Sequence, residues 1–281
     1  MARPPRIEIV DGVYHVVARG NERRTVFRDT RDRERFLALL GQVVGRYRWQ
    51  VLCYCLMGNH YHLLVATPDA NLARGMRQLN GVYAQWFNHR HRRVGHLFQG
   101  RYKAVLVQRD RHLQSAVRYI VRNPLRARIS TRVDEWPWTS HAATMGAAQA
   151  GVVAVAELLS YLGQDTVTAR ARYLELVDDT SQPEAAAHPV LDGDDDFVRE
   201  HLALLRSSPE HPREAVRAPR PPLEMLVSSC HDAAAIHGAY RDHGYSMRQI
   251  ATHLGCGVTT IHRRVREHET GVAPEPGTWK T

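Results

Sequence analysis

The chain has 281 residues, of which 43% are hydrophobic, so it can bury a core in one large domain or two ordinary ones and is not a disordered protein. No stretch approaches the roughly 18 consecutive apolar residues of a membrane-spanning helix, and residues 1–6 lack the apolar run of a signal peptide. The four cysteines are too few and too scattered for a disulfide framework. We therefore expect a reduced, cytoplasmic protein with no membrane partner.

The positive charge is concentrated in the first half of the chain. The net charge is +9, yet residues 1–129 contain 24 lysines and arginines against 8 acidic residues, whereas residues 130–281 contain 14 against 21. Nearly all these cations are arginines, whose planar guanidinium matches two phosphate oxygens at once. A GC-rich genome explains the preference for arginine over lysine, but it does not explain the asymmetry. The first half therefore resembles a phosphate-backbone binder.

Alternating and helical hydrophobic patterns follow one another through the first sixty residues. Residues 12–19 alternate as a strand, and residues 20–24 combine turn residues with cations. Asp29 and Thr30 are suited to cap a helix whose apolar positions run to about residue 47. Residues 49–57 predict a second strand, residues 58–59 a tight turn, and residues 60–66 the partner strand of a hairpin.

The following segment completes an α+β pattern. Residues 68–71 start a helix with apolar residues three and four apart up to Phe87, and a basic run follows at residues 88–93. Residues 102–108 predict a fourth strand, and Asp110 begins a third helix that Pro124 stops. The order predicts a ferredoxin-like fold, an antiparallel sheet of split βαβ units with helices packed on one face. Such a fold specifies no function by itself.

Two histidines lie at the start of the hairpin's second strand. Residues two apart on a strand share a face, so His60 and His62 would present two imidazoles side by side while Tyr61 points the other way. Neutral imidazoles are common ligands of divalent metals. The alternative is a pair of ordinary core or surface histidines. By the same spacing, Cys53 and Cys55 share a face and are expected to be small core residues.

The third predicted helix carries a second pair of polar side chains. Tyr119 and Asn123 are four residues apart and would lie one above the other, beside the apolar stripe of that helix. In isolation the tyrosine is explained as a packing residue and the asparagine as a helix-end residue.

Four sequence blocks, taken together and in order, carry a family resemblance. They are Tyr14-His15-Val16-Val17-Ala18-Arg19-Gly20-Asn21, Leu56-Met57-Gly58-Asn59-His60-Tyr61-His62, His96-Leu97-Phe98-Gln99-Gly100-Arg101-Tyr102 and Arg118-Tyr119-Ile120-Val121-Arg122-Asn123-Pro124. Over residues 8–142 the chain resembles the single-tyrosine HUH transposases of the IS200-like class, and within that class the REP-associated tyrosine transposases. Gly58 departs from the family, where many members have proline, which changes the stiffness of the turn but not the ligands.

The resemblance implies a chemistry and a substrate. Tyr119 would be the nucleophile that cuts single-stranded DNA and forms a 5′-phosphotyrosine intermediate. His60, His62 and Asn123 would bind Mg²⁺ or Mn²⁺, and the partners would be hairpins of palindromic repeats. The residues expected to contact the DNA backbone in this half are Arg19, Asn21, Arg23, Arg24, Arg101 and Lys103.

The sequence of the second half of the chain predicts helices. We expect residues 1–142 to form the catalytic domain and residues 143–221 a helical linker region, with helices at 154–162 and 168–177 and a proline-rich break at 209–222. Residues 192–196 fit either a cation site or, better, a helix start. Residues 222–270 predict an all-α unit in which residues 245–265 form a helix-turn-helix that binds duplex DNA. Its outward-facing recognition residues would be Thr259, Thr260, His262, Arg263 and Arg264.

Alternative functions remain for this pattern. One is a catalytically silent, sequence-specific DNA-binding regulator, and another is a replication initiator or relaxase with the same HUH chemistry. An RNA-binding ferredoxin-like module would need exposed aromatic residues on the sheet, and no such pattern is present. The sequence allows a monomer or a homodimer, in a bacterial, nucleoid-associated setting.

Overall fold

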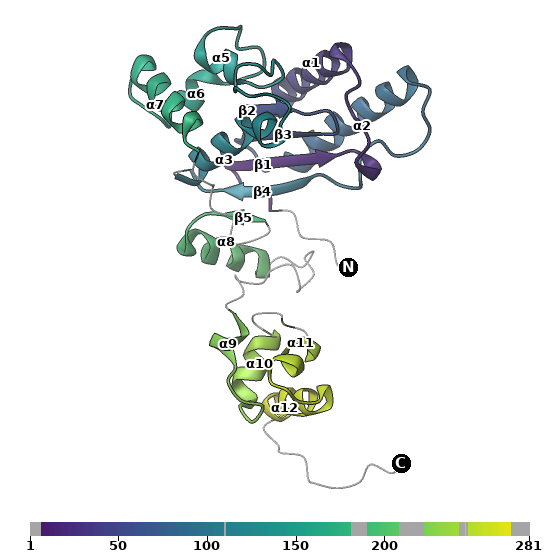
Figure 1. The fold of residues 1–281 in the computed structure, drawn as a ribbon, viewed down its shortest axis with the longest axis vertical. Coiled ribbons are helices and arrows are strands. Elements are labelled where there is room, and N and C mark those ends of the chain that lie inside the picture. The colour runs from purple at the N-terminus through teal and green to yellow at the C-terminus, as the bar shows by residue number, and fades with distance from the viewer. Residues whose placement is uncertain are drawn as a thin grey trace. The chain divides into compact units, whose positions relative to one another are not determined.

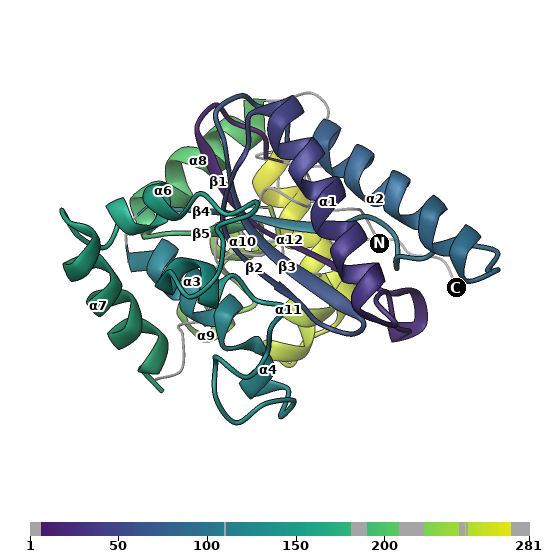
Figure 2. The same cartoon turned by 90° about the horizontal axis from the view of Figure 1, so that it is seen from above.

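The chain forms two compact units. The computed structural model describes residues 7–109, 111–180, 190–207, 222–241, 245 and 247–270. Of these residues, those up to Phe197 form one unit and those from Val198 onward form the other. Figure 1 shows the helices and strands of both units along the chain, and α4 is labelled in Figure 2.

The first unit is an α+β structure whose early elements follow the predicted order. Its elements are β1 (Gly12–Arg19), a 3-10 turn (Asn21–Arg23), α1 (Thr30–Tyr47), β2 (Gln50–Leu56), β3 (His60–Thr67), α2 (Leu72–Arg90), β4 (Lys103–Val107), α3 (Arg111–Val121), α4 (Asn123–Arg126), α5 (His141–Met145), α6 (Val155–Ser160), α7 (Thr166–Asp178) and β5 (Leu191–Asp192). Helix α8 (Asp195–Ser207) spans the boundary between the units. The start of α8 agrees with the helix-start interpretation of residues 192–196.

The sheet contains the predicted four antiparallel strands and one further strand. Its order is β2-β3-β1-β4-β5, with β1 paired antiparallel to both β3 and β4. This is the order of a split βαβ fold. The short β5 pairs in parallel with β4, Leu106 opposite Leu191, so the sheet is mixed. The sequence prediction missed β5 because two residues give no periodic signal.

Helices cover both faces of the sheet, so the expectation that they pack on one face is wrong. On one face, the Tyr61 ring of β3 packs against Phe36 of α1, with ring centroids 4.6 Å apart. On the other, Leu64 of β3 belongs to a core that includes Val117 of α3 and Tyr173 of α7. Figure 2 shows α1 and α2 to one side of the strands and α3, α6 and α7 to the other. Strand β3 is therefore buried on both faces.

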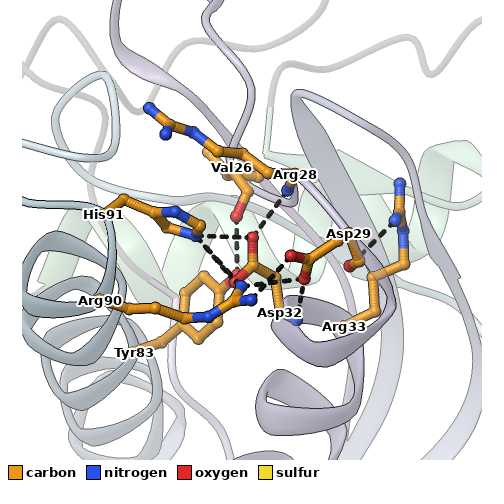
Figure 3. Close-up of polar contacts among 8 residues, drawn as sticks. All are labelled: Val26, Arg28, Asp29, Asp32, Arg33, Tyr83, Arg90 and His91. Atoms are coloured by element: carbon orange, nitrogen blue, oxygen red, sulfur yellow. Dashed lines mark hydrogen bonds and ion pairs between the residues drawn. The ribbon is translucent and has the colours of Figure 1, made fainter.

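A buried polar cluster joins the start of α1 to the end of α2. Asp29 caps α1 by accepting a hydrogen bond from the backbone N–H of Asp32, as its position in the sequence predicts. The Asp32 carboxylate is fully buried and contacts Arg90 and His91 (Figure 3). We call Asp29, Asp32, Arg90 and His91 the Asp32 cluster.

The third helix stops before Pro124, as predicted, but a short further helix follows it. Helix α3 ends at Val121, and α4 begins at Asn123 with Pro124 in its first turn. A proline is tolerated there because a first-turn N–H has no partner within the helix. The predicted starting residue of α3, Asp110, lies outside the described residues.

The segment after α4 extends the core of the first unit. Leu158 of α6 and Tyr173 of α7 are fully buried with Val117 and Ile120 of α3. The predicted helices at 154–162 and 168–177 correspond to α6 and α7. The domain boundary at residue 142 stays a prediction.

After α8, the described part of the second unit contains four further helices. They are α9 (Leu223–Leu226), α10 (Ala233–Arg241), α11 (Met247–His253) and α12 (Val258–Thr270). They agree with the all-α unit predicted for residues 222–270. Ile236 of α10, Ile250 of α11 and Ile261 of α12 are fully buried in a shared core.

The turn between α11 and α12 depends on a glycine. Gly255 adopts a φ of 62°, a left-handed conformation that glycine reaches without steric cost. The prolines expected to break the chain at 209–221 lie outside the described residues, apart from Pro222, which caps α9. None of the described helices is both long and apolar enough to cross a membrane.

Candidate active site

Two imidazoles lie side by side at the beginning of β3. His60 is paired with Arg19 of β1 in the antiparallel register, and the ring centroids of His60 and His62 are 5.1 Å apart. Tyr61, between them, points to the opposite face, where its hydroxyl donates to Asn80 of α2 at 2.6 Å. The prediction that both histidines share one face is confirmed.

The Nδ1 atom of each imidazole is already engaged. His60 Nδ1 lies 2.6 Å from Asn59 Oδ1, and His62 Nδ1 lies 2.9 Å from Nε2 of His15 on β1. The Asn59 amide is itself oriented, because its Nδ2 donates to the Arg23 carbonyl at 3.0 Å. In both histidines, Nε2 is therefore the nitrogen that these bonds leave available.

Helices α3 and α4 bring two further predicted residues to the histidines. The Tyr119 ring meets the His62 ring edge to face, with centroids 5.6 Å apart. Asn123 donates from Nδ2 to the Tyr119 carbonyl at 3.0 Å, which leaves Oδ1 for another partner. The Asn123 side chain is also within hydrogen-bonding reach of His60. The structure thus brings His60, His62, Tyr119 and Asn123 together.

These side chains share one cavity of about 610 Å³. The Arg126 guanidinium lies over the Tyr119 ring, 4.7 Å from its centroid, at a distance typical of a cation–π contact. The cavity is lined by His15, Val17, Arg19, His60, His62, Gln99, Arg101, Lys103, Val105, Tyr119, Asn123, Arg126 and Ala127.

Burial keeps the imidazoles in the cavity neutral. Loss of hydration lowers the pKa of His60, with a further contribution from the Arg19 charge. Burial also lowers the pKa of His62 well below its ordinary value, and the neighbouring His15 and His60 add to this effect. For His15, burial and then Lys103 lower the pKa to about 4. A neutral imidazole is the form that binds a metal.

The donor set fits a divalent metal ion bound together with substrate. His60 and His62 each offer Nε2, and Asn123 offers an amide oxygen. Among the described residues there is no group of three or more His, Cys, Asp or Glu side chains placed to hold a metal. A site of two imidazoles and one amide therefore needs water or substrate oxygens to complete the ion's coordination, as Mg²⁺ and Mn²⁺ sites at phosphates commonly do.

The predicted DNA-contacting residues of the first half separate into two groups. Arg19, Arg101 and Lys103 line the cavity beside the histidines. Asn21, Arg23 and Arg24 are outside it, in and after the 3-10 turn that follows β1. Arg23 and Arg24 are exposed, and Arg24 forms a 2.7 Å ion pair with Glu22.

The predicted recognition residues all lie on α12, in the second unit. Thr259, His262 and Arg263 are exposed, whereas Thr260 and Arg264 are half-buried. Arg264 donates to Glu267, three residues later on the same helix, at 2.7 Å, and its Nη2 lies 3.2 Å from His231 Nδ1. The assignment of these residues to DNA recognition stays a prediction.

The sequence prediction missed three residues of this site. His15 was part of a family block but was given no role, Asn59 was seen only as a turn residue, and Arg126 was not considered. The alternation of β1 could have identified His15, because it shares a face with Arg19. Arg126 follows Asn123 by three residues, and a helix continuing past Pro124 would have placed it beside Tyr119.

A comparison with protein families finds one match that coincides with these residues. The family described as "Transposase IS200 like" matches residues 9–123, from just before β1 to Asn123. Residues 9–123, about two fifths of the chain, are thus similar to the IS200-like transposase family. The matched segment includes the two histidines, Tyr119 and Asn123, so the candidate site lies within it. No curated protein matches the chain.

Solved structures similar to the chain include two transposases. One is a REP-associated tyrosine transposase bound to a REP hairpin, with 16% sequence identity, a TM-score of 0.46, and coverage of 66% of this chain and 98% of that one. The other is a proposed transposase from Deinococcus radiodurans R1, with 16% identity, a TM-score of 0.30, and coverage of 48% and 96%.

Proposed function

We propose that the protein is a metal-dependent endonuclease and strand transferase that cuts and rejoins single-stranded DNA at hairpins of palindromic repeats. The observation that carries this proposal is the convergence of a tyrosine, two neutral imidazoles and an amide oxygen on one cavity lined by cations. The IS200-like match of residues 9–123 supports the same class of reaction. A protein made only to bind DNA would have no need of a tyrosine beside two such imidazoles.

Tyr119 would supply the attacking oxygen. Its phenol oxygen would form a bond to phosphorus while the bond from phosphorus to the 3′ oxygen breaks, and the phenol proton would pass to solvent. The products are a 5′-phosphotyrosine and a strand with a free 3′-hydroxyl. Attack by a second 3′-hydroxyl would release the tyrosine and join the strands, so no external energy source is needed.

The other residues would orient the phosphate and stabilise its charge. Arg19, Arg101 and Lys103 place three cations around the cavity, where they would position the DNA backbone without reading its sequence. The Nε2 atoms of His60 and His62 and the Asn123 amide oxygen would hold Mg²⁺ or Mn²⁺. When bound, the ion supplies Lewis-acid stabilisation of the charge on the scissile phosphate.

A covalent adduct is the result that tests this proposal. The protein is incubated with single-stranded hairpin DNA from palindromes of its own genome, labelled at either the 5′ or the 3′ end, with Mn²⁺, with Mg²⁺ or with EDTA. A 5′-phosphotyrosine predicts that only the 3′-labelled fragment stays attached to protein on a denaturing gel, and that EDTA abolishes the adduct. Tyr119→Phe should form none.

Tyr47→Phe is the matched control, because the Tyr47 hydroxyl bonds Gln78 at 3.2 Å and does not line the cavity. It should form the adduct at the wild-type rate. Hairpin binding without an adduct under any condition would instead support the silent DNA-binding regulator. Cleavage at a nick site, with no preference for palindromes, would support the replication initiator or relaxase.

We propose a second role, duplex DNA binding, for the α11–α12 region. The supporting observation is that α11 and α12 share a core around Ile250 and Ile261, while His262 and Arg263 of α12 are exposed. An exposed helix after a short turn has the form of a recognition helix. Replacing Arg263 with alanine should weaken duplex binding without changing the hairpin adduct, which gel shifts and adduct assays measure separately.

A further inference from the structure

The two imidazoles of the candidate site are supported in different ways. His60 faces the Oδ1 atom of Asn59, and the bond from Asn59 Nδ2 to the Arg23 carbonyl fixes which end of that amide is the acceptor. His60 must therefore carry its proton on Nδ1. His62 faces another imidazole, Nε2 of His15, at 2.9 Å.

A pair of neutral imidazoles can share a hydrogen bond in two arrangements. In one, His62 donates from Nδ1 and His15 accepts at Nε2, so His62 keeps an unprotonated Nε2. In the other, His15 donates from Nε2 and His62 accepts at Nδ1, so the His62 proton occupies Nε2. Only the first arrangement leaves His62 a lone pair for a metal, because the hydrogen bond made by one ring nitrogen determines the state of the other.

His15 is held firmly in this position. It lies on β1 opposite Leu64 of β3, next to the Val17–His62 pair and on the same face of the sheet. Its ring meets the Tyr119 ring edge to face, with centroids 5.7 Å apart. The neighbouring strand and the Tyr119 ring of α3 thus flank the His15 ring, which lies against His62.

We propose that His15 is a positioning residue that holds His62 in the tautomer whose Nε2 can bind the divalent metal. This inference rests on the proposed function, because it concerns the metal site of that reaction. His15 would not be a ligand itself, since in this arrangement its Nε2 accepts from His62 and its Nδ1 carries its proton. Metal-binding histidines generally need such a partner at the second nitrogen, and its loss typically weakens metal affinity about 10- to 100-fold.

Two variants of His15 distinguish the effect of its hydrogen-bond acceptor from the effect of its ring. His15→Gln can place an amide oxygen where Nε2 lies and so accept the same hydrogen bond. His15→Phe retains a ring of similar shape but offers no acceptor. His112→Gln is the matched control, because His112 is a histidine on α3 that pairs with Asp192 outside the cavity.

The first measurement is Mn²⁺ binding to the full chain without DNA, followed by electron paramagnetic resonance. Relative to wild type, His15→Phe should bind Mn²⁺ about 10- to 100-fold more weakly. His15→Gln and His112→Gln should bind within about threefold of wild type. Equal affinity of the wild-type and His15→Phe proteins, with both folded by circular dichroism, would overturn the inference.

The second measurement does not depend on the phenylalanine variant folding. Long-range ¹⁵N–¹H spectra of the histidine side chains report which ring nitrogen carries the proton. We expect His62 to be protonated at Nδ1 in wild type and in His15→Gln, and a proton on Nε2 in wild type would overturn the inference. Failure of the wild-type protein to bind Mn²⁺ would contradict the proposed metal site as well, whereas wild-type binding with an unaffected His15→Phe would contradict this inference alone.

Discussion

Replacing Asp32 with alanine is expected to lower the free energy of unfolding of the first unit by about 3–5 kcal/mol. The Asp32 carboxylate is fully buried. It accepts from the Arg28 backbone N–H at 2.7 Å and lies 2.9 Å from His91 Nε2, and it also pairs with Arg90 (Figure 3). The alanine variant would leave the Arg28 N–H and the His91 imidazole without this acceptor in a largely buried site, whereas Arg90 would keep Asp29 as a partner. The two lost contacts with a buried carboxylate are the reason that the expected loss is large.

Asp29→Ala is the matched control for this substitution. Asp29 pairs with the same arginine, through two hydrogen bonds of 2.9 and 2.7 Å, but its side chain is 46% exposed. Its loss removes a helix cap and an exposed ion pair, and Arg90 keeps Asp32 as a partner. We expect a loss of about 1 kcal/mol.

Urea unfolding followed by tryptophan fluorescence measures both variants. Four of the five tryptophans lie between residues 49 and 138, so the signal reports mainly on the first unit. Its midpoint temperature in a parallel thermal scan should fall by roughly 10 °C for Asp32→Ala and by a few degrees for Asp29→Ala. Equal losses for the two variants would refute the assignment of the stabilisation to the buried carboxylate.

Two further predictions concern the cavity. Arg126→Ala removes the guanidinium from the Tyr119 ring, a contact of about 0.5–1 kcal/mol. Single-turnover adduct formation should therefore slow by about two- to fivefold, and an unchanged rate would contradict a positioning role for this contact. The pKa of His15 is about 4 in the folded protein against an ordinary value of 6.5. As the pH falls, His15 is therefore protonated first in the unfolded chain, and the free energy of unfolding of the wild-type protein should fall between about pH 6.5 and pH 4. His15→Gln should remove about 3 kcal/mol of that acid-induced loss in urea titrations at pH 7 and pH 4, and identical pH profiles for the two proteins would contradict the neutral, buried state of His15.

Local periodicity was sufficient to predict which side chains share a face. The two-residue period of a strand placed His60 with His62, and the four-residue spacing on a helix placed Tyr119 near Asn123. Both relations depend only on the conformation of one element, so they could be predicted without knowing the tertiary structure. The roles of these residues came from the family resemblance and remain proposals.

Relations between elements could not be predicted in this way. The contact from His15 to His62 depends on the register between β1 and β3, which are separated by a helix and another strand. Strand β5 pairs with β4 from more than eighty residues away. Strand β3 is apolar on both faces because α3 covers the face opposite α1 and α2. Its sequence therefore lacks the alternation of apolar and polar residues that would indicate a sheet covered on one face only.

The loss of alternation in β3 raises the question of what fixes its register, since a slip by one residue would turn both histidines to the other face. The residues that follow the histidines, Leu63, Leu64 and Val65, are all fully buried, so each could face either side of the sheet. The backbone polar groups at the turn would lose their hydrogen bonds if the strand slipped. The Met57 N–H donates to the His60 carbonyl at 2.9 Å, and the Gly58 carbonyl accepts from the N–H groups of Val26 and Phe27.

The same turn connects the candidate site to the Asp32 cluster. The Tyr83 hydroxyl of α2 donates to the Val26 carbonyl at 2.6 Å, and the Arg28 N–H donates to Asp32. The segment that holds the turn is thus anchored at its far end by the buried carboxylate. The carbonyl of Arg23, in this same segment, orients Asn59 and through it His60. The contacts of residues 26–28 with α1 and α2 therefore help to hold the segment that orients an imidazole of the candidate site.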